Sequence, residues 1–132
     1  MERYFYLDRL KSLQDLDEEE WGKSNFGSYL LTRAYELHKI PIGHFSVEDL
    51  RLMIGQKIGL EYLVPLAIEE LGEDPLISGN YLPGDLLNAV LKVEQGFWDE
   101  HLELKRDIEE ILASTIKNLT EALEGFRLRN NY

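Results

Sequence analysis

The residues whose types could support catalysis are three histidines and a scatter of carboxylates. His38, His44 and His101 could bind a metal or transfer protons near neutral pH, but none has a second histidine four residues away to share its helix face. Asp99 and Glu103 have the spacing of an acid/base pair on one helix face. A chain with 25 acidic residues produces such pairs by chance. We therefore predict no metal site and no catalytic dyad.

Nucleophile and phosphate-binding motifs are equally missing. The sequence contains no G-x-S-x-G motif and no glycine-rich phosphate loop after a strand. It contains no cysteine, which excludes disulfides, thiolate metal sites and cysteine nucleophiles. The serines fit helix caps or turns better than catalysis: Ser12, Ser24, Ser28, Ser46 and Ser78. The sequence predicts a protein that is not an enzyme and holds no cofactor.

The charge balance favours a binding role. Fourteen basic and 25 acidic residues give the 132-residue chain a net charge of −11. Such a surface repels nucleic-acid phosphates and anionic lipid, and it speeds encounter with a basic protein. The N-terminal residues carry Glu2 and Asp8 without the apolar core of a secretory signal. The longest apolar run, 62–68, is far shorter than the ~20 residues needed to span a bilayer. We expect a cytoplasmic protein.

The middle of the chain, residues 45–71, carries the clearest structural signals. Ser46 and Asp49 have the spacing of a capping box at the start of a helix. Gly55 is expected to end that helix and Gly59 to permit a turn into a second one. Pro65 is expected in the first turn of the second helix, where its missing N–H costs nothing. Two short helices joined by a glycine turn should therefore form the centre of the fold.

Further helices are expected on both sides of this centre. We predict a brief helix after Ser12, one over 28–39, one capped by Asp85 and running to about residue 93, and a long one to Glu124. Gly125 should end the long helix and leave a basic tail. Strand signals are weak and no linker divides the chain. The prediction is an all-α fold, a compact single domain over 1–132 with about six helices.

The long C-terminal helix carries a sustained apolar stripe. Its members recur with helical period: Leu104, Ile108, Ile111, Leu112, Thr115, Ile116, Leu119 and Leu123. The stripe could cover the core, or it could pair with a second subunit as a coiled coil. Its spacing drifts from strict heptads, which favours core packing. A monomer or a weak homodimer fits this pattern.

Two groups of carboxylates are dense enough to form a binding surface for a basic protein. The first lies at the C-terminal end of the second central helix, which is the unfavourable end of its dipole for negative charge, and consists of Glu69, Glu70, Glu73 and Asp74. The second is the densest acidic run in the chain: Asp17, Glu18, Glu19 and Glu20. Trp21 and Tyr81 are the expected aromatic anchors. The alternative for both groups is a solvated helix end.

Several segments, in order and spacing, resemble immunity proteins of bacterial contact-dependent growth inhibition systems. The segments are LQDLDEEEWG from Leu13, SYLLTRAYELHKIPIGHFSVEDLR from Ser28, IGQKIGLEYLVPLAIEEL from Ile54 and NYLPGDLLNAVL from Asn80, with a looser match at FWDEH from Phe97. The resemblance covers about residues 12–112. It implies a cytoplasmic protein that binds and neutralises the toxin domain, usually a nuclease, at the C-terminus of a large effector delivered by a neighbouring cell.

The charge and motif analysis and the family resemblance together give a functional hypothesis. We expect a 1:1 inhibitor of a toxin, most simply an RNase, whose basic cleft is occluded by carboxylates standing where phosphates would bind. The alternative is an acidic helical adaptor that binds another basic cytoplasmic protein, as a dimer through the 104–123 stripe.

Overall fold

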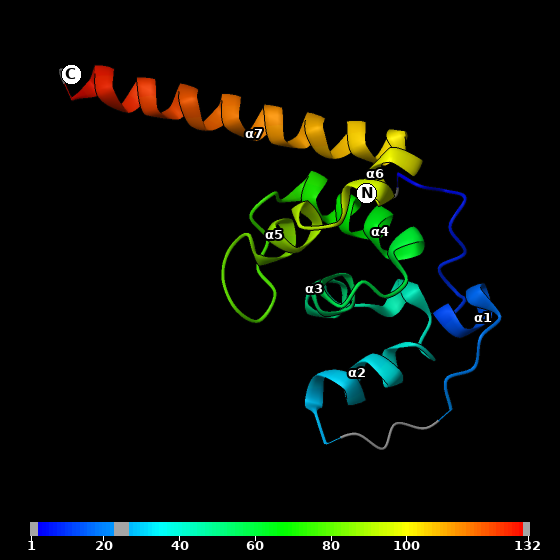
Figure 1. Ribbon diagram of the computed structural model, residues 1–132. Helices are drawn as coiled ribbons and strands as arrows, with labels where there is room; N and C mark the ends of the chain where they lie inside the picture. Colours follow the sequence, from blue (N-terminus) through cyan, green and yellow to red (C-terminus); the bar gives the residue numbers. More distant parts are fainter. Residues whose placement is uncertain (1–2, 23–26, 131–132) are drawn as a thin grey trace.

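The computed structural model describes residues 3–22 and 27–130, and these form an all-α fold (Figure 1). In chain order its α-helices are α1 (Leu13–Asp17), α2 (Tyr29–Leu37), α3 (Val47–Gly55), α4 (Leu60–Glu73), α5 (Asp85–Leu91), α6 (Gln95–Glu100) and α7 (Leu102–Arg129), with a 3-10 turn at Ile42–His44. The predicted fold class is confirmed. Seven helices replace the expected six because the last segment is divided at His101.

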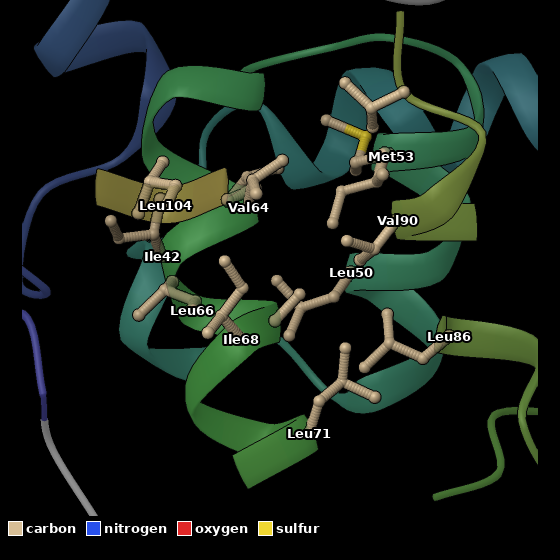
Figure 2. Close-up of a cluster of buried hydrophobic side chains, with 14 of the residues drawn as sticks. Ile42, Leu50, Met53, Val64, Leu66, Ile68, Leu71, Leu86, Val90 and Leu104 are labelled. Carbon is tan, nitrogen blue, oxygen red and sulfur yellow. The ribbon is translucent and has the colours of Figure 1, made fainter. Parts of the chain in front are cut away.

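The core is built around α3 and α4. Helix α3 packs against both α4 and α5, and α4 packs in turn against α7. Figure 2 shows the apolar side chains that meet there, among them Leu50, Met53, Ile68, Leu71 and Val90, all 0–2% exposed. Burying side chains of this size contributes about 1.5–3 kcal/mol each. The predicted central pair of helices is therefore the centre of the fold.

The start of α3 follows the prediction. The Ser46 hydroxyl accepts a hydrogen bond from the Asp49 N–H at 3.1 Å, and the Asp49 carboxylate accepts one from the Ser46 N–H at 3.0 Å. The same reciprocal arrangement links Ser12 and Asp15 at the start of α1. Each box satisfies two backbone donors that the first turn leaves without helical partners.

The turn between α3 and α4 differs in detail from the expectation. Gly55 is the last residue of α3, but the left-handed residues are Lys57 and Gly59, with φ of 61° and 63°. A β-carbon at Gly59 would lie only 2.8 Å from Leu13 Cδ2, so α1 sits directly against this turn. Pro65 is inside α4, five residues beyond the first, so the expected first-turn position is wrong. Gly59 starts the helix earlier by accepting from the N–H groups of Tyr62 and Leu63.

Asp85 is not the cap of α5. Gly84, with φ of 85°, occupies that position, and the Asp85 carboxylate turns back to accept from the N–H groups of Gly79, Tyr81 and Leu82 at 2.7, 3.2 and 3.4 Å. It therefore organises the preceding loop. Burial raises the pKa of Asp85, but these backbone hydrogen bonds outweigh burial and leave the pKa lowered.

Helix α7 is long and only its first part is in the core. Leu104 and Ile108 are buried and Ile111 is half-buried, whereas Ile116, Leu119 and Leu123 are exposed. Figure 1 shows the C-terminal half extending past the other helices. The prediction that the whole stripe packs in the core is therefore wrong. Gly125 does not end the helix, which continues to Arg129 and includes the predicted basic tail.

Candidate partner-binding surfaces

The predicted acidic group at the end of α4 is divided by the N-terminal segment. The Glu69 carboxylate pairs with the Arg9 guanidinium at 2.8 and 2.7 Å, and it accepts from the N–H groups of Arg3 and Tyr4 at 2.7 and 2.9 Å. Burial raises the pKa of Glu69, but the hydrogen bonds from Arg9, Arg3 and Tyr4 outweigh it and lower the pKa. Glu69 therefore holds residues 3–9 against α4.

The other three carboxylates of this group lie on the surface. Glu70, Glu73 and Asp74 are exposed, and Asp74 Oδ1 accepts from the Leu76 N–H at 3.1 Å. Between the end of α4 and the middle of α7 lies a groove of about 400 Å³ that is lined by Arg3, Gly72, Glu73, Pro75, Glu110, Ile111, Ser114, Thr115 and Asn118. We name the three carboxylates and this groove the α4 surface. Its charge is mostly negative.

The second acidic run lies at the end of α1. Helix α1 ends at Asp17, and Glu18 adopts the left-handed conformation with φ of 55°. The chain then leads Glu19 and Glu20 to Trp21, whose ring stacks on His38 with centroids 3.9 Å apart and lies 5.0 Å from the Tyr35 ring. Local helix termination thus places an aromatic side chain directly beside the acidic run.

A hollow of about 510 Å³ lies between α2 and the residues that follow α1. Its lining is Glu19, Glu20, Trp21, Leu31, Ala34, Tyr35 and Ile58. Apolar and aromatic side chains make the floor, and two carboxylates stand at the edge. We name this the α1–α2 surface. An aromatic centre with a charged rim is the usual anatomy of a protein-binding hot spot.

His38 supports the floor of the α1–α2 surface. It is fully buried, and neither ring nitrogen has a hydrogen-bond partner among the described residues. Burial lowers its pKa and outweighs the opposing effect of Asp17 and Glu19. The ring is therefore neutral at pH 7 and serves as a flat apolar platform under Trp21.

Tyr81 lies apart from Trp21, in the loop before α5. Its ring is exposed and stands 4.5 Å from the guanidinium carbon of Arg51, which also pairs with Glu48 at 2.6 Å. Glu48 Oε1 in turn accepts from the Asn80 N–H at 3.0 Å. The structure therefore does not bring the two predicted anchors together.

The two acidic surfaces also lie apart. Helix α1 contacts the beginning of α4, where the Tyr62 hydroxyl donates to the Leu16 carbonyl at 3.4 Å. The carboxylates from Glu70 to Asp74 follow 8 to 12 residues later, which is about 12–18 Å along the helix at 1.5 Å per residue. One small contact could not cover both surfaces.

Some site residues escaped the sequence analysis. Leu31, Tyr35 and Ile58 come from α2 and the α3–α4 turn, and only the packing of α1 brings them to Trp21. Arg9 was overlooked as the partner of Glu69 because 60 residues separate them. An Arg close to an apolar N-terminal segment was the one available signal, and it does not specify which carboxylate it meets.

The remaining histidines have structural contacts. His101 stacks on Phe97 with centroids 4.1 Å apart, and its Nδ1 lies 2.8 Å from the Phe97 carbonyl oxygen. Within residues 3–22 and 27–130, no three His, Asp or Glu side chains are grouped as metal ligands.

None of the described helices combines the length and the apolar composition that a bilayer span requires.

Comparison with known proteins gives a family but no individual relative. A family model described as CDI immunity proteins matches residues 15–108, which include both central helices and the α1–α2 surface. No curated protein matches the chain, and no solved structure does. The matched residues make up more than two thirds of the chain, and they contain the segments that carry the resemblance in the sequence, apart from Leu13 and Gln14. The chain therefore belongs to the family of CDI immunity proteins.

Proposed function

We propose that this protein neutralises the toxin domain of a contact-dependent growth inhibition effector by binding it 1:1 in the cytoplasm. The toxin domain is proposed to be a nuclease, most simply an RNase, whose cleft is lined with basic residues. The protein acts by occlusion and catalyses nothing. Family membership supports the immunity role, and the net charge of −11 supports a basic target.

The observation that carries the proposal is the α1–α2 surface. Trp21, Tyr35 and Leu31 offer apolar area in a hollow that a protruding side chain can enter. Glu19 and Glu20 at its edge, with Asp17 and Glu18 one turn back, supply the negative charge that a phosphate-binding cleft attracts. Aromatic anchors supply affinity at such an interface, while the charged rim raises the association rate.

The α4 surface is the second part of the proposal. Glu70, Glu73 and Asp74 extend negative charge to the opposite end of α4. A toxin domain that buries a standard ~800 Å² on each partner can contact one acidic surface through its centre and sense the other through long-range attraction. Tyr81 stands near neither centre, and we place it at the edge of the contact.

The test is survival of cells that express the toxin encoded directly upstream, with binding measured on the purified pair. Glu19→Lys with Glu20→Lys and Trp21→Ala should abolish protection. Glu70→Lys, Glu73→Lys and Asp74→Lys should slow association with less effect on dissociation. Glu69 is left intact because its substitution would release residues 3–9 from α4.

The matched control is Glu100→Lys with Glu103→Lys, two exposed acids on α6 and α7 that change the net charge equally. Full protection by the control and none by the α1–α2 variant would support the proposal. Full protection by the α1–α2 variant would move the site elsewhere. Failure of the unaltered protein to protect against that toxin would favour the adaptor hypothesis.

A further inference from the structure

The distal half of α7 leaves a row of large apolar side chains in solvent. Ile116, Leu119, Leu123 and Phe126 are 64, 60, 46 and 48% exposed. They follow each other along a helix that Figure 1 shows extending past the rest of the fold. Contiguous apolar surface of this kind marks an interaction site in soluble proteins.

The spacing of this row is that of a coiled coil. From Leu112 the intervals are four, three, four and three residues, ending at Phe126. The drift from heptads noted in the sequence lies between the two halves: Leu104, Ile108 and Ile111 also keep intervals of four and three, but their line is one residue out of register with the distal row. The proximal line is covered by the core, whereas the exposed distal row keeps its own seven-residue repeat, which is the pattern for packing against one other helix.

The positions beside the row suit close approach of a second helix. Ala113, Thr115, Thr120 and Ala122 are small and uncharged. The charged residues Lys117, Glu121 and Glu124 fall on the opposite side of the helix at 100° per residue. Arg127 alone stands beside the row, exposed near the C-terminal end of the helix, so a second helix could lie along the rest of the row without meeting a charge.

The row is complementary to itself in the antiparallel direction. When two copies are aligned about Glu121, Leu119 of one lies level with Leu123 of the other, and Ile116 lies level with Phe126. This gives four apolar layers related by a two-fold axis, the usual symmetry of a homodimer. The two copies of Ala122 lie two residues apart along the axis, about 3 Å, where their small side chains permit close contact.

Charge separates the antiparallel from the parallel arrangement. Residues 112–129 carry three basic and two acidic side chains, a net charge of +1, whereas the whole chain carries −11. A parallel pair would place two strongly acidic bodies side by side and gather all four of Arg127 and Arg129. An antiparallel pair separates the bodies and places Arg127 and Arg129 of one copy level with residues 113–115 of the other, away from the other copy's arginines.

We propose that the distal half of α7 is a dimerisation surface, and that its occupant is the same segment of a second copy in antiparallel orientation. The α1–α2 surface lies at the far end of each body and stays accessible. The proposal is independent of the toxin-binding proposal.

The first experiment is sedimentation equilibrium of the full chain over a concentration series, without toxin. We expect a monomer–dimer equilibrium that Leu119→Glu with Leu123→Glu weakens by more than about tenfold, since two charges would enter the apolar layers. The matched control is Leu128→Glu, on the same helix and 78% exposed, but outside the row. The control should dimerise like the unaltered chain, and circular dichroism should show helix content retained in all three.

The second experiment fixes the orientation. The chain has no cysteine, so Ala122→Cys introduces a single thiol. In the antiparallel pair the two Cys side chains lie about 3 Å apart along the helix axis and can oxidise to a disulfide dimer, whereas Leu119→Cys lies about one turn from its copy and should crosslink poorly. A parallel pair would crosslink well through Leu119→Cys and poorly through Ala122→Cys, and that result would overturn the proposed arrangement.

A monomer at every concentration would overturn the proposal. So would equal loss of dimer in the Leu128→Glu control, which would indicate unspecific association. If the unaltered chain is monomeric and its Leu119→Glu, Leu123→Glu variant loses toxin binding, the row would be assigned to the toxin instead.

Discussion

The proximal and distal halves of α7 have similar apolar content but opposite environments. In the proximal half, Leu104 and Ile108 are buried, and Asp107 accepts from the buried Tyr4 hydroxyl at 2.6 Å and lies 3.5 Å from the Arg3 guanidinium. In the distal half, Ile116, Leu119 and Leu123 have solvent around them. One continuous helix thus has a buried half and an exposed half.

The difference shows what periodicity can and cannot specify. An apolar stripe specifies a helix with one face that seeks burial, but it does not specify what covers that face. The anchored half supplies the helical turn from which the distal half propagates, so the distal half needs no core of its own to remain helical.

The largest expected difference between the two halves of α7 is in how much a substitution lowers the free energy of unfolding. Ile108→Ala should lower the free energy of unfolding by about 2–4 kcal/mol, because it removes a buried side chain from the contact between α7 and the rest of the core. Leu119→Ala, below the dimerisation concentration, should change it by less than about 0.5 kcal/mol. Urea denaturation at low protein concentration measures both. Equal losses would mean that the distal half packs on the body in solution.

A second pair of variants sharpens the comparison at the charged residues. Asp107→Ala should cost about 1–3 kcal/mol, because it leaves the buried Tyr4 hydroxyl without its acceptor. Burial and the bond to Asp107 raise the pKa of Tyr4, so the hydroxyl remains a donor throughout the physiological range. Glu121→Ala on the exposed half is the matched control, with an expected change near zero. Thermal unfolding at low protein concentration compares the two. A small loss for Asp107→Ala would show that water replaces the carboxylate.

The smallest expected effect is on the pH dependence of stability, and it arises in the packed helices and not in the distal half of α7. The lowered pKa of His38 means that the unfolded chain binds more protons below about pH 6.5, so stability should begin to fall there as pH decreases. Because the pKa of Glu69 is lowered in the folded protein, its hydrogen bonds stabilise the fold above about pH 4.3. This stabilisation is lost as pH falls through the folded-state pKa. Unfolding curves from pH 7 to pH 3 should show both stages.

Glu69→Gln isolates the second of these stages. It should lower stability at pH 7 and flatten the loss between about pH 4.5 and pH 3, while Glu100→Gln, an exposed control, should leave the profile unchanged. An unflattened profile for Glu69→Gln would assign the acid sensitivity to other carboxylates, among them Asp85, whose pKa is also lowered.

Much of the fold could be predicted because its signals are local. The capping boxes of Ser12 and Ser46 involve residues three apart, and the apolar spacing of α3 and α4 lies within single helices. Predictions failed where a distant contact or a neighbouring residue took the expected role. Gly84 took the cap from Asp85, and the turn at Gly59 moved the helix start away from Pro65. For the candidate site, the acidic runs were visible in sequence, whereas the burial of Glu69 and the hollow under Trp21 were not.

The sequence by itself determined an acidic, cysteine-free, helical chain with the motifs of its family, because composition, capping and periodicity act over a few residues. Only the tertiary structure decided which carboxylates remain on the surface, which aromatic side chains stand beside them, and where α7 leaves the core. Those outcomes depend on contacts between residues as far apart as Tyr4 and Asp107, whose formation requires the whole chain to pack.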